Sequence, residues 1–507
     1  MSRRALLAAL LLTAAGCMSN APPPIPLRPV RFLAINDVYV ADTMADGRGG
    51  LPRVATVRRR LADQGPVVFV LAGDVLSPSL ASKYYHGHQM VEALNAAKLD
   101  YATFGNHDFD FERDTLLARI AESKFKWISS NCAQPNGDPL PQVLTWDTLR
   151  VSGHKVGLFG LTLQGNYPEY VRCSNPDTAA HKVIQTLGDE GADLIVGITH
   201  QAMATDRDLL GREPKLDLIL GGHEHEAQDS VVSGRHVLKA DANARTVQFA
   251  TLWGGKDKWR QATGLIRIDA GLPPDTAVAR VVGAWQDSVA QKLGPVQEVG
   301  TTGAPIDAVR SLSRRRESFL GDLVTDAMRA GTGADVALLN AGTLRLDQAI
   351  QPGPVTNYQL EAIFPFADQT RVVTFPLSGQ GVRRVLEHGV SQGVLGTGGF
   401  LQVSGLSFTF DPARPSGNRI VGDITRSQGR GGVLTTHDTV AVALGVYTAC
   451  EGGDGYSIPE AADACGRRSS APRAVDLLVR YITDSLKGHI EAPKDTRVVE
   501  AKNTNPG

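Results

Sequence analysis

The chain has 507 residues, enough for two or three domains, and its 42% apolar and 21% charged content is ordinary for a soluble globular protein. A formal net charge of −1 gives no bulk attraction to nucleic acid or to a membrane surface. No stretch of the mature chain is apolar for long enough to form a transmembrane helix. We therefore expect no nucleic-acid partner, and contact with a membrane only through a lipid anchor.

The first 17 residues predict an export signal. Two arginines at positions 3 and 4 precede the apolar run Ala5–Leu12, and small residues then lead to Cys17. This arrangement resembles a bacterial lipoprotein signal, in which Cys17 becomes the lipidated first residue. The alternative is ordinary signal-peptidase cleavage that removes Cys17. Residues 18–29 are proline-rich and predict an extended tether, so we expect an exported protein that Cys17 anchors in the cell envelope, facing the periplasm or the outside.

Residues 30–272 alternate strand-like and helix-like segments, which is typical of an α/β domain. Amphipathic helices are predicted over Leu51–Asp63 and His88–Lys98. Five short apolar runs predict strands, and each is followed by polar side chains; the runs are Val30–Ile35, Val67–Ala72, Ala102–Phe104, Leu194–Thr199 and Leu216–Leu220.

The polar side chains that follow those runs are the most informative pattern in the sequence. In chain order they are Asp37, Asp74, Asn106 with His107, His200, and finally His223 with His225. Polar groups at the ends of neighbouring strands meet in one crevice. A mixture of oxygen and nitrogen ligands there predicts a site for two borderline divalent ions.

A second unit is predicted after a linker. The linker, residues 273–296, contains one long helix, Thr276–Leu293, which Gly294 and Pro295 end. Residues 297–502 then have strands and helices of their own, and Ala413–Gly432 is predicted to be a surface loop. The expected strands are Val336–Leu339, Val372–Phe375, Leu406–Phe410 and Val440–Val446, and the expected helices are Leu320–Arg329 and Gly379–His388.

Four cysteines remain after the signal, and an even number in an exported protein indicates disulfides. Cys450 and Cys465 are the better pair because the segment between them is short and turn-rich. Cys132 and Cys173 form the complementary pair.

The ligand series resembles the signature of the calcineurin-like metallophosphoesterases. The resemblance implies an α/β (α+β) chain: a four-layer αββα sandwich over residues 30–272, followed by a smaller α/β substrate-binding domain. It also implies two divalent ions, Zn, Mn or Co. Site one would use Asp37, Asp74 and His225, and site two would use Asp74, Asn106, His200 and His223. Two cations that share the Asp74 carboxylate would clamp a phosphate and acidify a bridging water.

Two further residues follow from the same resemblance. His107 would stabilise the transition state or protonate the leaving oxygen, and Asp110 would orient its ring.

The sequence departs from the family at one ligand. The family has Asp-x-His in the first block, whereas here Tyr39 stands in place of that histidine. Tyr39 could ligate as a phenolate, which would favour trivalent iron, or it could line the cavity while water completes the site. The third reading is a weak site one in an impaired enzyme. We favour the second reading because every other ligand is present.

The second half carries motifs that resemble the C-terminal domain of the 5'-nucleotidase family. They are Arg316-Glu317, Asn340–Arg345, Phe364–Phe366, Gly399–Gly405 and Gly452–Tyr456. The resemblance implies that Arg316, Asn340 and Arg345 contact the α-phosphate and the ribose, and that Asp454 binds the ribose hydroxyls. Phe366 would be one face of a base sandwich, and Tyr447 the other if one residue is inserted.

Together the two resemblances imply a metal-dependent hydrolase of nucleoside 5'-monophosphates. Three alternatives remain: a UDP-sugar or 2',3'-cyclic nucleotide hydrolase, a thiosulfate-ester hydrolase, and a nucleotide binder without turnover if Tyr39 disables site one. The nucleoside-reading residues disfavour the thiosulfate-ester reaction.

Overall fold

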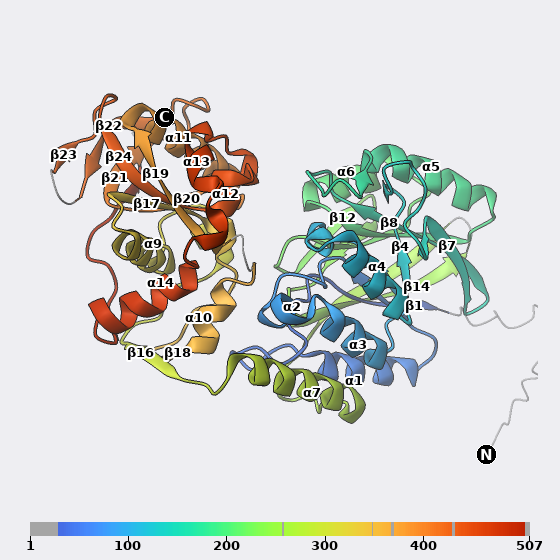
Figure 1. Cartoon of the computed structure of the whole chain (residues 1–507). Helices are drawn as coiled ribbons and strands as arrows, with labels where there is room; N and C mark the ends of the chain where they lie inside the picture. Colours follow the sequence, from blue (N-terminus) through green and yellow to red (C-terminus); the bar gives the residue numbers. More distant parts are fainter. Residues whose placement is uncertain (1–28, 256–257, 347, 367–369, 428–430, 502–507) are drawn as a thin grey trace, which may run out of the picture.

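A computed structural model describes residues 29–255, 258–346, 348–366, 370–427 and 431–501. The chain folds into two domains that lie side by side and are joined at one end by helix α7 (Thr276–Leu293) and the segment after it (Figure 1). The predicted signal, tether and Cys17 lie outside the described residues. Within the described residues, none of the helices combines the length and apolar character needed to cross a membrane.

Two sheets form the centre of the first domain. The first has the order β15 (Lys258–Arg267), β14 (Thr246–Gly255), β1 (Val30–Ile35), β2 (Val68–Ala72), β3 (Tyr101–Thr103), β4 (Lys126–Ile128), β6 (Val143–Leu144). The second has the order β12 (Gln228–Val232), β13 (Arg235–Lys239), β11 (Leu218–Gly222), β10 (Leu194–His200), β8 (His154–Thr162), β7 (Trp146–Val151). Apolar side chains from both sheets, Phe32, Val70, Leu158 and Val196 among them, form one buried cluster between them.

Helices cover the outer faces of both sheets. The first sheet packs against α1 (Leu51–Ala62), α3 (His88–Ala97), α4 (Arg113–Glu122) and α7, and the second against α5 (Pro176–Asp189) and α6 (Met203–Arg212). In α1, Leu51, Val54 and Val57 face the core while Arg59 and Arg60 are exposed, as the amphipathic pattern predicts. The predicted four-layer αββα sandwich is confirmed.

Helix α7 has the predicted bounds. Asp275 accepts hydrogen bonds from the backbone N–H groups of Ala277 and Val278, and Gly294 ends the helix with a φ of 74°. Val278 and Val282 are buried in the core of the first domain. The helix therefore packs as part of that domain, and the covalent crossing to the second domain is the short segment 294–297.

The second domain is smaller and mixed. Its central sheet has the order β19 (Val372–Ser378), β24 (Thr439–Gly445), β17 (Val336–Asn340), β20 (Leu401–Ser404). Two further sheets are β23 (Gly432–Val433), β22 (Ile420–Arg426), β21 (Leu406–Phe410), β26 (Val498–Glu500) and β18 (Gly353–Thr356), β16 (Glu298–Thr302), β25 (His489–Ile490). One core includes α9 (Phe319–Thr332), α10 (Asn357–Ile363) and α14 (Ala474–Arg480), and another includes α11 (Gly379–Leu395), α12 (Val446–Cys450) and α13 (Ala462–Cys465).

One predicted loop is wrong. Strand β22 lies inside Ala413–Gly432 and pairs with β21, and Ile420 and Ile424 bury their side chains in the core. The pairing with an apolar neighbour outweighs the local Gly/Arg/Ser composition, which alone favours a loop.

Both predicted disulfides are present. Cys132 binds Cys173 across the short pair of strands β5 (Cys132–Ala133) and β9 (Arg172–Cys173), and Cys450 binds Cys465. Each domain therefore contains one disulfide, which is typical of exported proteins.

Candidate active site

The strand ends of the first domain bring the predicted ligands together. Asp37 follows β1, Asp74 follows β2, and His200 is the last residue of β10; one ligand atom from each lies within 4.8 Å of the others. Asp37, Asp74 and His223 have φ angles of 52°, 57° and 85°, in the left-handed region that non-glycine residues avoid. Such backbone is kept where the surrounding structure holds it for function.

Site two fits a divalent ion. His200 Nδ1 lies 2.8 Å from the carbonyl oxygen of Ala72, which leaves Nε2 as the ligand atom. Among the described residues, His200 Nε2 and Asn106 Oδ1 are buried and have no hydrogen-bond partner. An amide oxygen and an imidazole nitrogen, together with the Asp74 carboxylate, are ligands that suit a borderline divalent cation. Asp74 Oδ2 lies 3.4 Å from His200 Nε2, and the His223 ring lies 5.3 Å from the His200 ring.

The charged side chains at this centre shift one another's pKa values. Burial alone would lower the pKa of His200, but the carboxylates of Asp74 and Asp37 outweigh it and raise that pKa to about 9. Burial and the neighbouring His200 lower the pKa of His223 to about 3. Burial would raise the pKa of Asp74, yet His200 and His107 hold it well below its usual value. The carboxylates thus attract positive charge to this position.

Site one has a different arrangement. His225 Nε2 lies 3.5 Å from Asp37 Oδ1, as the ligand pattern requires. The hydroxyl of Tyr39 lies 3.2 Å from Asp37 Oδ1, 2.9 Å from Asp74 Oδ2 and 3.1 Å from His225 Nε2. A guanidinium from the other domain, that of Arg310, also contacts His225 Nε2. The ligand atoms of site one are therefore engaged by the protein itself.

Asp108 fixes the two loops that carry the ligands, and its role was not anticipated. Its buried carboxylate accepts hydrogen bonds from the N–H groups of Asp74, Val75, Leu76 and Gly105, at 2.8–2.9 Å. A Cβ at Gly105 would lie 2.1 Å from Asp74 Oδ1, so only glycine permits this approach. The spacing of these loops is thus set by one carboxylate.

Lys239, at the end of β13, fixes the histidine loops in a similar way. Its fully buried ammonium donates hydrogen bonds to the carbonyl oxygens of Gln201 (2.6 Å) and Gly222 (2.8 Å). The carboxylates of Glu224 (2.5 Å) and Asp206 (3.0 Å) balance its charge. Because Gln201 follows one ligand and Gly222 precedes another, Lys239 ties β10 to β11 at the metal end.

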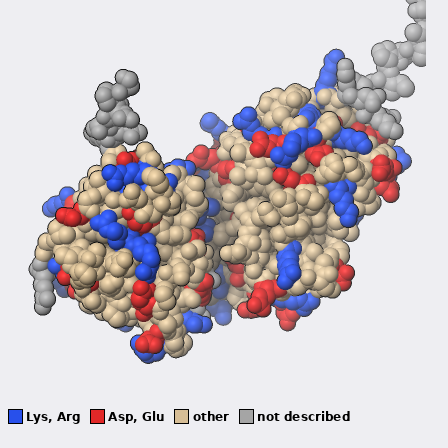
Figure 2. All heavy atoms as spheres, turned by 90° about the horizontal axis from the view of Figure 1, so that it is seen from above, with Lys and Arg blue, Asp and Glu red and all other residues tan. Residues whose placement is uncertain are grey.

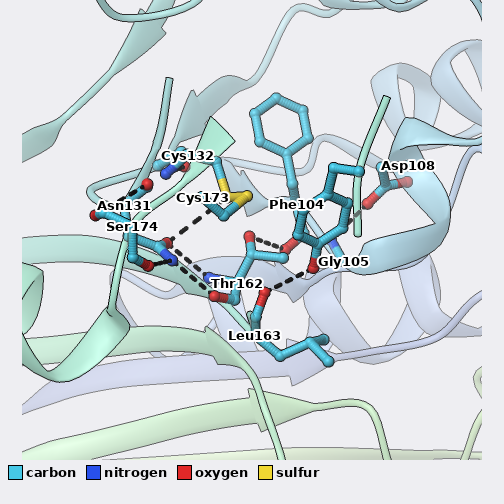
Figure 3. Close-up of a disulfide and its surroundings, with 11 residues drawn as sticks. Phe104, Gly105, Asp108, Asn131, Cys132, Thr162, Leu163, Cys173 and Ser174 are labelled. Carbon is cyan, nitrogen blue, oxygen red and sulfur yellow. Dashed lines mark hydrogen bonds between the residues drawn. A yellow bond between two sulfur atoms is a disulfide. The ribbon is translucent and has the colours of Figure 1, made fainter. Parts of the chain in front are cut away.

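The disulfide of the first domain lies beside the loop that begins at Gly105 (Figure 3). Asn131, next to Cys132, bonds both the amide and the carbonyl of Thr162, at 2.9 and 2.7 Å. The Thr162 hydroxyl donates to the carbonyl of Phe104 at 2.7 Å. The disulfide thus supports, through buried hydrogen bonds, the residue that precedes the Gly105 turn.

His107 and Asp110 form the predicted pair. His107 Nδ1 lies 2.9 Å from Asp110 Oδ2, and the Ser77 hydroxyl donates to the same oxygen at 2.8 Å. The imidazole is therefore oriented, and its Nε2 is the atom that can exchange a proton with a substrate. The backbone N–H of His107 also donates to Asp74 Oδ1 at 2.8 Å, which couples this pair to the metal ligands.

Residues of both domains line one cleft of about 450 Å³. Asn106, His107, Asp110 and His223 come from the first domain; Asn340, Arg345, Phe366, Tyr447 and Asp454 come from the second. The space-filling view shows the domains as two lobes that meet along a furrow (Figure 2). The ring centroids of His107 and Phe366 are 6.1 Å apart across the domain boundary.

The side chains of the second domain bind one another. Asn340 Nδ2 donates to Asp454 Oδ2 at 2.9 Å, and the Thr343 hydroxyl donates to Asn340 Oδ1 at 2.6 Å. The Arg345 guanidinium lies 5.1 Å from the Phe366 ring centroid, a cation–π distance. Thus five of the six residues expected to bind substrate are brought together.

Arg316 is the exception. Its side chain is exposed and lines a separate hollow with Asp322 and Asp495. Arg310 and Arg314 line the cleft instead. The basic run that contains all three was visible in the sequence, but the position of each arginine depends on the turn of helix α8 (Arg310–Ser313) before α9.

Fold and site together define a metallophosphoesterase. Residues 30–227 match the calcineurin-like phosphoesterase family, and residues 298–461 match the 5'-nucleotidase, C-terminal domain. The two matches follow each other along well over half of the chain. The chain therefore belongs to the 5'-nucleotidase family and is a phosphoesterase with a buried Asp/His cluster for divalent metal ions.

Individual relatives are distant. Snake venom 5'-nucleotidase of Naja atra is 25% identical over 82% of this chain and 86% of its own length. The trifunctional nucleotide phosphoesterase protein YfkN of Bacillus subtilis (strain 168) is 26% identical over 83% of this chain, which spans only 32% of that protein. The crystal structure of a 5'-nucleotidase precursor from Thermus thermophilus superposes with a TM-score of 0.81, covering 94% of this chain and 100% of that one at 24% identity.

Proposed function

We propose that the chain hydrolyses nucleoside 5'-monophosphates to nucleoside and phosphate. The observation that carries the proposal is the shared cleft, in which metal ligands face Asn340, Phe366 and Asp454. A phosphate at the metal ligands would place its nucleoside against these side chains. The similarity to snake venom 5'-nucleotidase, which spans most of both chains, supports the same reaction.

Divalent ions, two arginines and His107 have separate roles in this reaction. Bound divalent ions, Zn²⁺, Mn²⁺ or Co²⁺, would polarise the phosphoryl oxygens and lower the pKa of a coordinated water. The guanidinium groups of Arg345 and Arg314 bind the phosphate, since planar forks match its oxygens. His107, held by Asp110, donates a proton from Nε2 to the leaving 5'-oxygen.

Recognition of the nucleoside rests on the second domain. Phe366 and Tyr447 both line the cleft and offer aromatic faces to a base, which tolerates different bases. The carboxylate of Asp454 accepts hydrogen bonds from the ribose hydroxyls. Asn340, which donates to Asp454, keeps that carboxylate in place.

A broader nucleotide phosphoesterase is the second candidate, because the trifunctional protein of Bacillus subtilis matches 83% of this chain. A substrate panel separates the two. Purified protein with added Mn²⁺, Zn²⁺ or Co²⁺ is assayed with AMP, UDP-glucose and 2',3'-cyclic AMP. We expect AMP to have the highest kcat/KM; a higher value for either of the others would reject the proposal.

We also propose that the protein is exported and anchored through Cys17. The two disulfides support export. Mass spectrometry of the membrane-fraction protein should find a diacylglyceryl group on Cys17, and Cys17→Ser should move the protein to the soluble fraction. An unmodified, soluble wild-type protein that begins after residue 17 would reject the anchor.

The domain bounds are part of the same proposal: catalysis by residues 30–272, a linker over 273–296, and substrate binding by 297–502. Because α7 packs on the first domain, relative motion would begin at Gly294. Limited proteolysis of the full chain should first cut near residues 294–297. First cleavage inside either domain would contradict these bounds.

A further inference from the structure

The phenol of Tyr39 touches every ligand residue of site one. Tyr39 is buried, and its single hydroxyl lies within 3.2 Å of oxygens of Asp37 and Asp74 and of His225 Nε2. It occupies the sequence position at which a histidine ligand is expected. A hydroxyl there can donate a hydrogen bond to one carboxylate, which satisfies it without a cation.

Arg310, which belongs to the second domain, contacts His225 of site one. Its Nη1 contacts His225 Nε2 and lies 3.2 Å from His225 Nδ1. Because Nη1 is close to both ring nitrogens at once, the guanidinium lies against the imidazole ring and off the axis of the Nε2 lone pair. A metal ion at site one would need the lone pair of that same ring, and it would meet the positive charge of Arg310. Arg310 therefore places a positive charge beside the atom through which His225 would bind a metal ion.

Site two offers the opposite arrangement. Asn106 Oδ1 is buried and accepts no hydrogen bond from the described part of the chain, and His200 Nε2 faces the carboxylates of Asp74 and Asp37, at 3.4 and 4.0 Å. Three of the atoms that would hold an ion at site one (Asp37 Oδ1, Asp74 Oδ2 and His225 Nε2) contact Tyr39, and one of them also contacts Arg310. The ligand atoms of site one thus contact Tyr39 or Arg310, whereas Asn106 Oδ1 at site two accepts no hydrogen bond from the described residues.

We propose that the chain holds one metal ion tightly, at site two, and that Arg310 together with Tyr39 takes the place of the ion at site one. This inference rests on the proposed phosphoesterase function. A guanidinium supplies a fixed positive charge and a planar pair of donors for phosphoryl oxygens. Because Arg310 belongs to the second domain, the positive charge of the centre is complete only when the two domains face each other.

Metal stoichiometry tests the inference without any substrate. The full chain is stripped of metal, titrated with Mn²⁺, and examined by elemental analysis and electron paramagnetic resonance. We expect close to one equivalent and the spectrum of an isolated Mn²⁺ ion. The Tyr39→His/Arg310→Met variant should bind close to two equivalents and show the exchange-coupled spectrum of a two-metal site, whose ions lie about 4 Å apart.

A neighbouring arginine provides the matched control. Arg315→Met removes the same charge from the same segment, and Arg315 is exposed; this variant should retain one equivalent. Two coupled ions in the wild type would overturn the inference, as would a double variant that folds with an unchanged circular dichroism spectrum and still binds one. A wild type with one ion that cleaves no nucleoside 5'-monophosphate would instead reject the proposed function.

Discussion

The two domains build their halves of the cleft by different means. In the first, buried side chains bind backbone: the Asp108 carboxylate accepts four N–H groups and Lys239 donates to two carbonyls. In the second, the binding residues bond to one another, as Asn340 does to Asp454. Side chains that hold the backbone fix the positions of the groups attached to it, whereas contacts between side chains that line the cleft can be exchanged for contacts with a ligand. We infer that the first domain holds the reacting groups in place, whereas the second domain can adjust its contacts to the ligand.

The largest effect should come from the shared metal ligand. Asp74→Asn removes the carboxylate charge that faces His200 at site two and the Tyr39 hydroxyl at site one, and we expect kcat/KM for AMP to fall by more than about 10⁴-fold. Hydrolysis of p-nitrophenyl phosphate should fall equally, since the loss concerns chemistry and not recognition. Steady-state kinetics of both substrates measure this, with metal content determined beside them. A loss confined to AMP would break the assignment of chemistry to the first domain.

The next effect concerns the proton donor. His107→Ala should lower kcat for AMP by roughly 10²- to 10⁴-fold, the usual contribution of general acid–base catalysis. p-Nitrophenolate leaves as a stable anion, so its phosphate ester should lose far less. Comparison of kcat for the two esters in one preparation is the measurement. Equal losses would show that His107 stabilises the phosphoryl group and does not protonate the leaving oxygen.

A smaller effect is expected in the second domain. Phe366→Ala removes one stacking face worth about 1–3 kcal/mol, so kcat/KM for AMP should fall roughly 5- to 150-fold, mainly through KM. The same variant should hydrolyse p-nitrophenyl phosphate at the wild-type rate. Fluorescence or calorimetric binding of adenosine gives an independent value. An equal loss on both substrates would mean that Phe366 supports the fold of the site.

The smallest effects on turnover should come from the disulfides. The loop between Cys132 and Cys173 spans 41 residues and that between Cys450 and Cys465 spans 15, so chain entropy predicts losses of about 4 and 3 kcal/mol in unfolding free energy. Only the Cys132→Ser/Cys173→Ser variant should also weaken metal binding, because its disulfide supports the Phe104 loop. Denaturant unfolding and Mn²⁺ titration of both double variants measure this. Weaker metal binding in the Cys450→Ser/Cys465→Ser variant would remove the distinction.

The sequence predicts local features well where one pattern decides them. Helix α7 has the predicted bounds because an amphipathic run ends at Gly294 and Pro295. The ligand series was predictable because it follows short apolar strands in order. Strand β22 was not, since its stability depends on pairing with β21.

Residues whose partners are distant backbone groups could not be predicted from the sequence. Asp108 lies inside the ligand motif, yet its four partners come from two loops that only the fold brings together. Arg310, Arg314 and Arg316 are the same residue type, so the sequence pattern does not show which of them faces the cleft. The helical turn of α8 decides this. Arg316 was therefore expected at a position that Arg310 and Arg314 occupy.

We propose that both domains act on one substrate molecule in the cleft between them. The most direct test of this proposal is the ratio of kcat/KM for AMP to that for p-nitrophenyl phosphate in the wild-type chain with Mn²⁺. Recognition by the second domain predicts that AMP is favoured by at least about tenfold, with adenosine and phosphate released in equal amounts. A ratio near or below unity would show that the second domain does not recognise the nucleoside, and would rule out a substrate site that the two domains share.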